Sequence, residues 1–231
     1  MKEKTGSDIV EIREFRDRRY VFKDRPEAGR ILAGMLEGFR GSDALVLAVP
    51  AGGVAVAAAL AGALSLPLDV AVVSKITLSW NSEVGYGAVA FDGTMRLNEE
   101  LLNRMKLSPQ EIEEGVQKTQ RKVARRVKKL RGDGSMPDLT RPVILVDDGL
   151  ASGFTLVVAV EALRNSGARE IILAVPTAHE ESLRRVLGKV EAIYCPNVRG
   201  GSSFAVAEAY EDWRDLDEEE VIRILADFRT N

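Results

Sequence analysis

Two adjacent carboxylates follow an apolar run in the second half of the chain. The run Val143 to Val146 predicts a strand buried on both faces, and it ends directly at Asp147 and Asp148. Ionised carboxylates only accept hydrogen bonds, so an adjacent pair suits the two hydroxyls of a ribose diol and could also reach a divalent cation. A plain Asp-Asp-Gly turn is the commoner explanation of the pair when it is taken alone.

A short polar loop, residues 149–155, comes next and leads into a predicted helix over 156–164. Gly153 permits close approach of the backbone, while Ser152 and Thr155 add hydroxyl donors. Unpaired backbone N–H groups at a helix start favour an anion. Helix capping explains the hydroxyls alone, but a diol site beside a monophosphate site predicts a ribose 5-phosphate ligand.

A second loop, Pro50-Ala51-Gly52-Gly53, follows the predicted strand 44–49 and precedes an Ala-rich helix over 54–64. Parallel strands end at one edge of their sheet, so this loop should lie at the same edge as Asp147. Paired glycines let backbone amides close on a ligand, and a diphosphate is the natural guest.

The segment from Asp147 to Thr155 resembles the phosphoribosyl diphosphate (PRPP) signature of type I phosphoribosyltransferases. Four further segments are similar to a subgroup of predicted phosphoribosyltransferases without an assigned substrate: residues 47–56, 83–90, 97–100 and 205–213. The resemblance extends from about Phe22 to the C-terminus.

The resemblance implies a role for each part of this region. The PRPP 5-phosphate would be bound by Gly149, Leu150, Ala151, Ser152, Gly153, Phe154 and Thr155. Pyrophosphate would be bound by Ala51, Gly52 and Gly53, and the catalytic residues would be Asp147, Asp148 and Lys75. Mg²⁺ would be the cofactor, held by Asp147 and Asp148 directly or through water.

Two alanines depart from the pattern of related transferases. Ala51 stands where many relatives carry an arginine, and its absence removes a cation that would offset leaving-group charge. Lys75, at the end of the next predicted strand, could supply that charge or could simply face water. Ala151 stands where purine-salvage members that act on hypoxanthine or guanine carry a carboxylate, which disfavours that substrate class.

Two functions follow. The first is a PRPP-dependent phosphoribosyltransferase that moves ribose 5-phosphate to a nitrogen acceptor, a nucleobase or related compound, and releases pyrophosphate. The second is a non-catalytic regulatory protein that binds PRPP or a nucleotide, since Ala51 and Ala151 remove aids to chemistry and leave the ribose-phosphate site intact. The small-molecule acceptor is not identified by any residue.

The predicted architecture is α/β: one phosphoribosyltransferase domain, residues 1–231, with a Rossmann-like parallel sheet of about five strands. The core would comprise residues 22–76 and 142–195, with its strands at 44–49, 68–74, 143–146, 170–176 and 190–194. A hood would come from residues 1–22 and 195–231. Its aromatic residues could cover an acceptor or close a small satellite core: Tyr194, Phe204, Tyr210 and Trp213.

An insertion is expected between the two halves of the core, over residues 77–141. Glycines punctuate 84–91 and 94–97, which predicts an antiparallel hairpin. Ser108-Pro-Gln-Glu111 then predicts the start of a long amphipathic helix. Its basic face is either a surface that recruits PRPP or nucleic acid, or an ordinary solvated face, which is the expectation adopted: Lys118, Arg121, Lys122, Arg125, Arg126, Lys128 and Lys129.

Composition excludes several classes of protein. The chain has 231 residues, a net charge of −3 and one cysteine, so no intrachain disulfide forms and nucleic acid is not a favoured partner. No segment predicts a membrane span or a secretory signal, and a reducing cytoplasm is the expected compartment. A homodimer is the default expectation for an oligomer.

Overall fold

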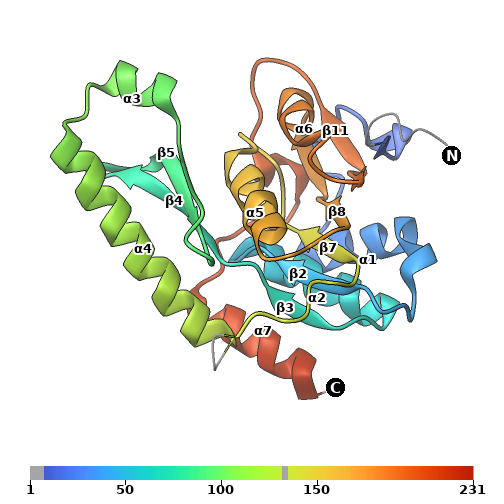
Figure 1. Cartoon of the computed structure of the whole chain (residues 1–231). Helices are drawn as coiled ribbons and strands as arrows, with labels where there is room; N and C mark the ends of the chain where they lie inside the picture. Colours follow the sequence, from blue (N-terminus) through green and yellow to red (C-terminus); the bar gives the residue numbers. More distant parts are fainter. Residues whose placement is uncertain (1–7, 132–134, 231) are drawn as a thin grey trace, which may run out of the picture.

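The computed structural model describes residues 8–131 and 135–230, and a six-stranded parallel sheet forms its centre (Figure 1). The sheet order is β1-β10-β8-β7-β2-β3. The strands are β1 (Asp8–Val10), β2 (Leu45–Ala48), β3 (Leu68–Val70), β7 (Val143–Val146), β8 (Ile171–Ala174) and β10 (Ala192–Tyr194). The predicted α/β class and parallel sheet are confirmed.

Helices cover both faces of this sheet because its central strands are apolar on both sides of the pleat. Along β7, Ile144 and Val146 face one core cluster, while Val143 and Leu145 face the other. The first cluster includes side chains from α1 (Arg25–Met35), α2 (Gly52–Leu64) and α7 (Glu218–Thr230). The second includes side chains from α5 (Phe154–Asn165) and α6 (Glu180–Val186).

The sixth strand, β1, corrects the expectation that the N-terminal segment belongs entirely to the hood. Residues Asp8–Val10 pair in parallel with β10, with Ile9 opposite Ile193, and so extend the edge of the core sheet. Three residues are too few to show a strand period. The sequence therefore held no strand signal at this position.

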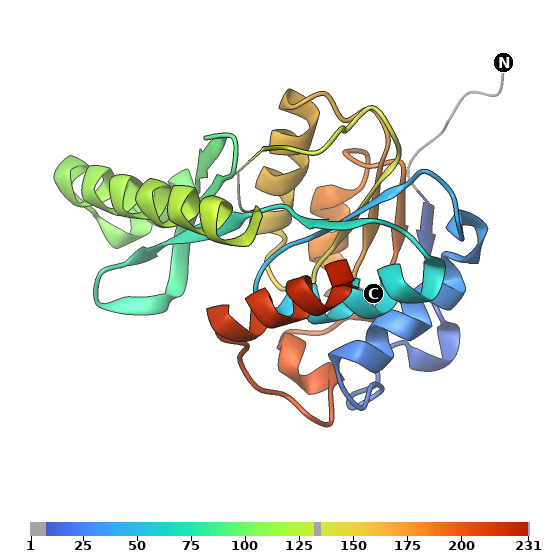
Figure 2. The same cartoon turned by 90° about the horizontal axis from the view of Figure 1, so that it is seen from below.

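The insertion begins earlier than predicted, because the expected strand over 68–74 is two strands. β3 ends at Val70, and β4 (Val73–Leu78) leaves the core sheet to pair antiparallel with β5 (Asn81–Ala90). β6 (Met95–Leu97) completes this second sheet and confirms the predicted hairpin. α3 (Glu99–Met105) and the long α4 (Pro109–Arg131) follow, and together these elements form an arm that extends from the core (Figure 2).

The arm is joined to the core by buried contacts as well as by its chain connections. Ile76, Tyr86 and Val123 from β4, β5 and α4 belong to the first core cluster. At the end of α4, the buried guanidinium of Arg131 donates to the Val70 carbonyl oxygen, with Nε at 3.1 Å. The base of α4 is therefore fixed against the core sheet.

The hood combines residues from both ends of the described chain. Phe22 bridges Tyr210, and these two side chains pack with Ala28 and Ala209 in a small third cluster. β9 (Thr177–His179) and β11 (Asn197–Arg199) form a separate parallel pair beside it. Within residues 8–131 and 135–230 there are also three short 3-10 helices: η1 (Arg13–Phe15), η2 (Glu37–Phe39) and η3 (Val206–Ala209). Among the described helices, none has the length and apolarity needed to cross a membrane.

Candidate ligand-binding site

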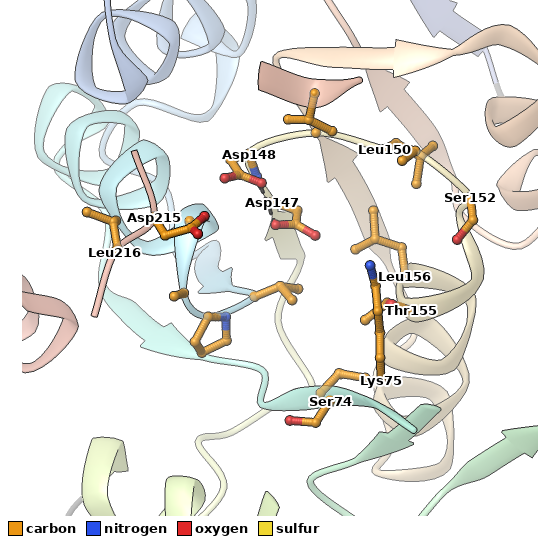
Figure 3. Close-up of a pocket in the computed structure, with 18 of the residues that line it drawn as sticks. Ser74, Lys75, Asp147, Asp148, Leu150, Ser152, Thr155, Leu156, Asp215 and Leu216 are labelled. Carbon is orange, nitrogen blue, oxygen red and sulfur yellow. Dashed lines mark hydrogen bonds between the residues drawn. The ribbon is translucent and has the colours of Figure 1, made fainter. Parts of the chain in front are cut away.

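A cavity of about 740 Å³ opens at the carboxyl ends of β2 and β7 (Figure 3). Asp147, Asp148 and most of the loop 149–155 line one side, and Pro50, Ala51 and Gly52 line another. Strand β4, helix α4 and the C-terminal segment around Trp213 complete the walls. The two loops singled out from the sequence thus share one cavity at the edge where open α/β sheets bind ligands.

Glycine at positions 52 and 53 is required by how closely the two loops approach each other. A Cβ on Gly52 would lie 1.7 Å from Asp148 Oδ2, and one on Gly53 would lie 2.8 Å from the Val146 carbonyl oxygen. The absence of side chains therefore lets the start of α2 pack directly against both carboxylates. The Pro50–Ala51 peptide bond that leads into this turn is cis.

Burial and mutual repulsion dominate the electrostatics of the two aspartates. Burial raises the pKa of the Asp147 carboxyl well above its usual value, and the neighbouring Asp148 charge raises it further. Asp147 Oδ1 accepts a hydrogen bond of 2.8 Å from the Asp148 backbone N–H. Burial also raises the pKa of Asp148, but Arg25 opposes this shift. The site therefore holds negative charge that a cation would stabilise.

Arg25, at the first position of α1, is a site residue that sequence reasoning missed. Its Nε and Nη2 each lie 2.9 Å from Asp148 Oδ2, and its Nη1 donates to the Arg214 carbonyl oxygen. The guanidinium also stacks on the Trp213 ring, 3.9 Å from its centroid. The only local signal was a helix start at Asp24, which says nothing about a partner 123 positions away.

The last two residues of the loop 149–155, Phe154 and Thr155, form the start of α5. Gly153 has a φ of 76° and precedes the first helical residue, so the first-turn N–H groups of this helix face the cavity end of the loop. The loop is held from outside: the Leu150 N–H donates to Thr177 O, and Arg185 donates to Ser152 O. Phe154 packs against the second core cluster and does not line the cavity, so only its backbone could contact a phosphate.

Gly149 brings the hood onto this loop. A Cβ at this position would lie 2.5 Å from Val206 Cγ1, so glycine is needed for η3 to approach. Tyr210 contributes a second link, because its hydroxyl donates a 2.6 Å hydrogen bond to the Asp148 carbonyl oxygen. The hood is therefore packed directly over the two aspartates.

Lys75 lies inside β4 rather than at the end of a core strand, which corrects its predicted position. Its exposed side chain extends into the cavity toward Asp147 (Figure 3), and its charge lowers the pKa of that carboxyl. Pro50, Ala51 and Gly52 line another wall, whereas Gly53, which was also expected to bind pyrophosphate, does not line the cavity. Lys75 therefore faces the carboxylates, whereas the sequence suggested that it would replace a cation at Ala51.

The basic face of α4 is not wholly solvated, contrary to expectation. Lys122 and Arg126 line the cavity, and the Arg126 side chain is only 11% exposed. The helical pattern alone could not reveal this, because it does not show which part of a basic face meets another element. Ser74, in the neighbouring β4, has a buried hydroxyl without a hydrogen-bond partner among the described residues.

The one histidine of the chain and two aromatic residues expected in the hood lie away from the cavity. His179 Nε2 lies 2.9 Å from the Gly201 carbonyl oxygen, and its ring contacts Phe204 edge-on. Neither of these two residues lines the cavity, and neither does Tyr194. Trp213 and Tyr210 pack on each other at a centroid distance of 5.2 Å, which agrees with a satellite core that borders the site.

Known proteins are similar to this chain in sequence and in fold. The family model of the phosphoribosyl transferase domain matches residues 117–209. Two Mycobacterium tuberculosis proteins named as inferred phosphoribosyl transferases, MT0597 and Rv0571c, are each 32% identical over 206 residues, or 89% of this chain. The crystal structure of TT1426 from Thermus thermophilus is 30% identical, covers 90% of this chain and 98% of its own, and superposes with a TM-score of 0.68. The chain belongs to the type I phosphoribosyltransferase family.

Membership of this family agrees with the predicted fold and subgroup. The chain spans about half the length of the two mycobacterial relatives, 46% in each case. The Thermus protein matches over 90% of this chain and 98% of its own, so the two proteins share this fold over most of their length.

Proposed function

We propose that this chain is a PRPP-dependent phosphoribosyltransferase that transfers ribose 5-phosphate to a nitrogen acceptor and releases pyrophosphate. The observation that carries the proposal is the meeting of three parts in one cavity: the Asp147–Asp148 pair, the start of α5 and the loop 50–53, here called the diglycine loop. Each part matches one portion of PRPP, in the order diol, 5-phosphate and diphosphate.

The chain's own groups bind and orient the substrate in this proposal. Backbone N–H groups at the start of α5, with Ser152 and Thr155, hold the 5-phosphate. Asp147 and Asp148 accept hydrogen bonds from the ribose hydroxyls. As the acceptor nitrogen bonds to C1, the bond from C1 to the diphosphate oxygen breaks and pyrophosphate leaves with the electron pair. Positive charge that develops on the ribose at this point is stabilised by the two carboxylates.

The donor set fits Mg²⁺ held mainly by substrate. Among the described residues no group of three or more His, Cys, Asp or Glu side chains could hold a metal, so a site made only of protein ligands is not formed there. Mg²⁺ needs one or two carboxylates when phosphates and water fill its other positions. Asp147 and Asp148 would supply them, and the bound ion would neutralise charge on the diphosphate.

The acceptor would enter from the hood side of the cavity. Ala205, Val206, Ala207, Asp215 and Leu216 line this side, next to Trp213. One face of Trp213 is covered by Arg25, so this face is not available to stack on a base. Ala151 lines the cavity with a methyl group, which leaves no carboxylate in the loop to exchange a proton with a purine.

A second candidate function is PRPP-binding regulation without turnover. Ala51 and Ala151 favour it, since neither can assist the departure of pyrophosphate or the deprotonation of an acceptor. Binding of PRPP is common to both functions. Release of pyrophosphate in the presence of an acceptor separates them.

The test is a pyrophosphate-release assay with Mg-PRPP and a panel of purines, pyrimidines and small amines. Transfer predicts release that depends on one acceptor class and falls at least about tenfold in Asp148→Asn, because that variant loses an ionic partner of the developing charge. PRPP binding without release across the whole panel would support the regulator instead.

A further inference from the structure

We propose that Lys122 and Arg126, from the arm helix α4, bind the diphosphate of PRPP and replace the cation that is missing at Ala51. The inference rests on the proposed function and specifies which part of the substrate the arm contacts. It gives the insertion a direct role in recognising the leaving group.

The first observation is the position of these two side chains. They lie four residues apart on α4, so they project from one face of the helix, and both line the cavity that also contains Pro50, Ala51 and Gly52. The end of α4 is anchored to β3 through Arg131, and its N-terminal part packs on the arm sheet. The helix therefore presents the pair from a fixed support.

The second observation is an excess of positive charge at this wall. Partial burial lowers the pKa of the Lys122 amine, and the nearby cations Arg126 and Arg125 lower it further. Burial also lowers the pKa of the Arg126 guanidinium, with Glu218 opposing the shift. Cations held together in a partly desolvated wall are stabilised by an anion placed between them.

Glu218 offsets only part of the positive charge of Lys122 and Arg126. Its nearest contact to Arg126 is 3.6 Å, whereas its other carboxylate oxygen accepts a 2.7 Å hydrogen bond from Lys129. Lys122 has no ion pair within 4.0 Å among the described acidic residues. One shared carboxylate therefore faces several cations, which leaves room for a multiply charged guest.

The other two cations that line the cavity, Arg25 and Lys75, lie toward the two aspartates. Arg25 is bonded to Asp148, and Lys75 extends toward Asp147 on the ribose side. The buried Ser74 hydroxyl, which lines the same cavity, is a further polar group that lacks a protein partner among the described residues. Lys122 and Arg126 are therefore the lining cations that remain to offset the charge of the diphosphate, as an arginine in the diglycine loop would.

The experiment compares two ligands that differ in the diphosphate. Calorimetric titration of the full chain with Mg-PRPP and with ribose 5-phosphate would be performed on wild type and on the variant Lys122→Gln/Arg126→Gln. The expected result is a roughly 10- to 100-fold loss of affinity for Mg-PRPP, since charge-assisted contacts are removed, with ribose 5-phosphate binding unchanged. Equal affinity of wild type and variant for Mg-PRPP would overturn the inference.

A matched control keeps the same change in net charge. Arg121→Gln/Lys128→Gln removes two exposed cations of α4 that do not line the cavity, and it should bind both ligands like wild type. An equal loss in this control would contradict the inference, because it would show a general electrostatic field rather than contacts. Lys122→Gln alone alters an exposed side chain and should still weaken Mg-PRPP binding if the double variant folds poorly. No binding of Mg-PRPP by wild type would instead contradict the proposed function itself.

Discussion

At the scale of single residues, the site depends on side chains that are absent as much as on those that are present. Glycines at 52, 53 and 149 allow the diglycine loop and the hood to approach the two aspartates. Around these close contacts, Arg25 and Lys75 partly balance the carboxylate charge. The local motifs were visible in the sequence because each lies within nine consecutive residues.

Gly52→Ala tests the close approach directly. The added methyl would overlap Asp148 Oδ2, so either the carboxylate or the start of α2 must move, at a cost of about 1–3 kcal/mol in unfolding free energy. PRPP affinity should fall at least about tenfold, measured by calorimetry, because the diphosphate and diol sites are displaced together. Gly34→Ala in α1 is the control: nothing lies within 4 Å of its added Cβ, and it should match or slightly exceed wild-type stability. A Gly52→Ala protein that binds PRPP like wild type would contradict the geometry.

Asp147→Asn tests the electrostatic cost of the carboxylate pair. The folded-state pKa of Asp147 is above its unfolded value, so the native protein loses stability as pH rises from about 3.8 through the folded pKa. Asparagine keeps the acceptor for the Asp148 N–H but cannot ionise. The variant should gain about 0.5–2 kcal/mol over wild type at neutral pH, and the gain should shrink as pH falls toward 4. Urea unfolding between about pH 4 and pH 8 measures it; a gain that is independent of pH, or a loss, would argue against a raised pKa.

At this scale, the sequence could not indicate which side chains far apart along the chain would contact each other. Asp147 and Asp148 were recognised because a strand and a loop flank them, whereas Arg25 has no local feature that differs from an ordinary helix start. Lys75 was found, but its partner was misjudged, since the direction of a side chain depends on which sheet its strand joins. Lys122 and Arg126 were listed within a basic face and could be separated from it only by the packing of α4.

At the scale of elements, the arm sets the shape of the cavity. β4 supplies Ser74 and Lys75 to its lining, and α4 supplies Lys122 and Arg126. The Ser108–Glu111 capping box begins this helix: the Ser108 N–H donates to Glu111 Oε2 at 2.8 Å, and the Glu111 N–H donates to Ser108 Oγ at 3.3 Å. The sequence predicted this box and the hairpin, because both are local patterns.

Ser108→Ala should loosen the first turn of α4 and leave the site unaffected. Loss of the cap costs about 1 kcal/mol, and Lys122 lies more than three turns further along the helix. Hydrogen exchange of the first-turn amides should accelerate, with PRPP affinity unchanged. Gln110→Ala is the control on the same turn, since it removes an exposed side-chain contact and should change stability by less than about 0.5 kcal/mol. Unchanged first-turn exchange in Ser108→Ala would show that packing, not the cap, fixes this helix end.

Strand boundaries were less predictable than strand positions. Residues 70–73 are apolar without a break, so nothing in them marks the point at which the chain leaves the core sheet between β3 and β4. β1 was missed for the opposite reason, because its three residues form a strand only through pairing with β10. Both differences come from tertiary pairing, which local periodicity does not encode.

At the scale of the whole molecule, one parallel sheet supports the site, the arm and the hood. Two core clusters on opposite faces of this sheet include residues from both halves of the chain, and arm residues join both of them. This arrangement predicts that the described residues unfold as a single cooperative unit.

Cys195 provides a test of that cooperativity. It is fully buried after β10, where burial raises the pKa of its thiol and its Sγ–H donates to Asn197 O. A thiol reagent should therefore label the native protein far more slowly than the denatured protein. Labelling in urea should follow the same midpoint as the helical signal by circular dichroism. A loss of helical signal well before labelling would show that the arm unfolds independently.

The binding of PRPP is tested most directly by titrating wild type and Asp148→Asn with PRPP in the presence of Mg²⁺, with ribose 5-phosphate as a competing ligand. The account predicts one saturable site in wild type, competition by ribose 5-phosphate, and binding at least about tenfold weaker in Asp148→Asn. A wild-type protein that gives no binding heat, or a variant that binds equally well, would contradict it.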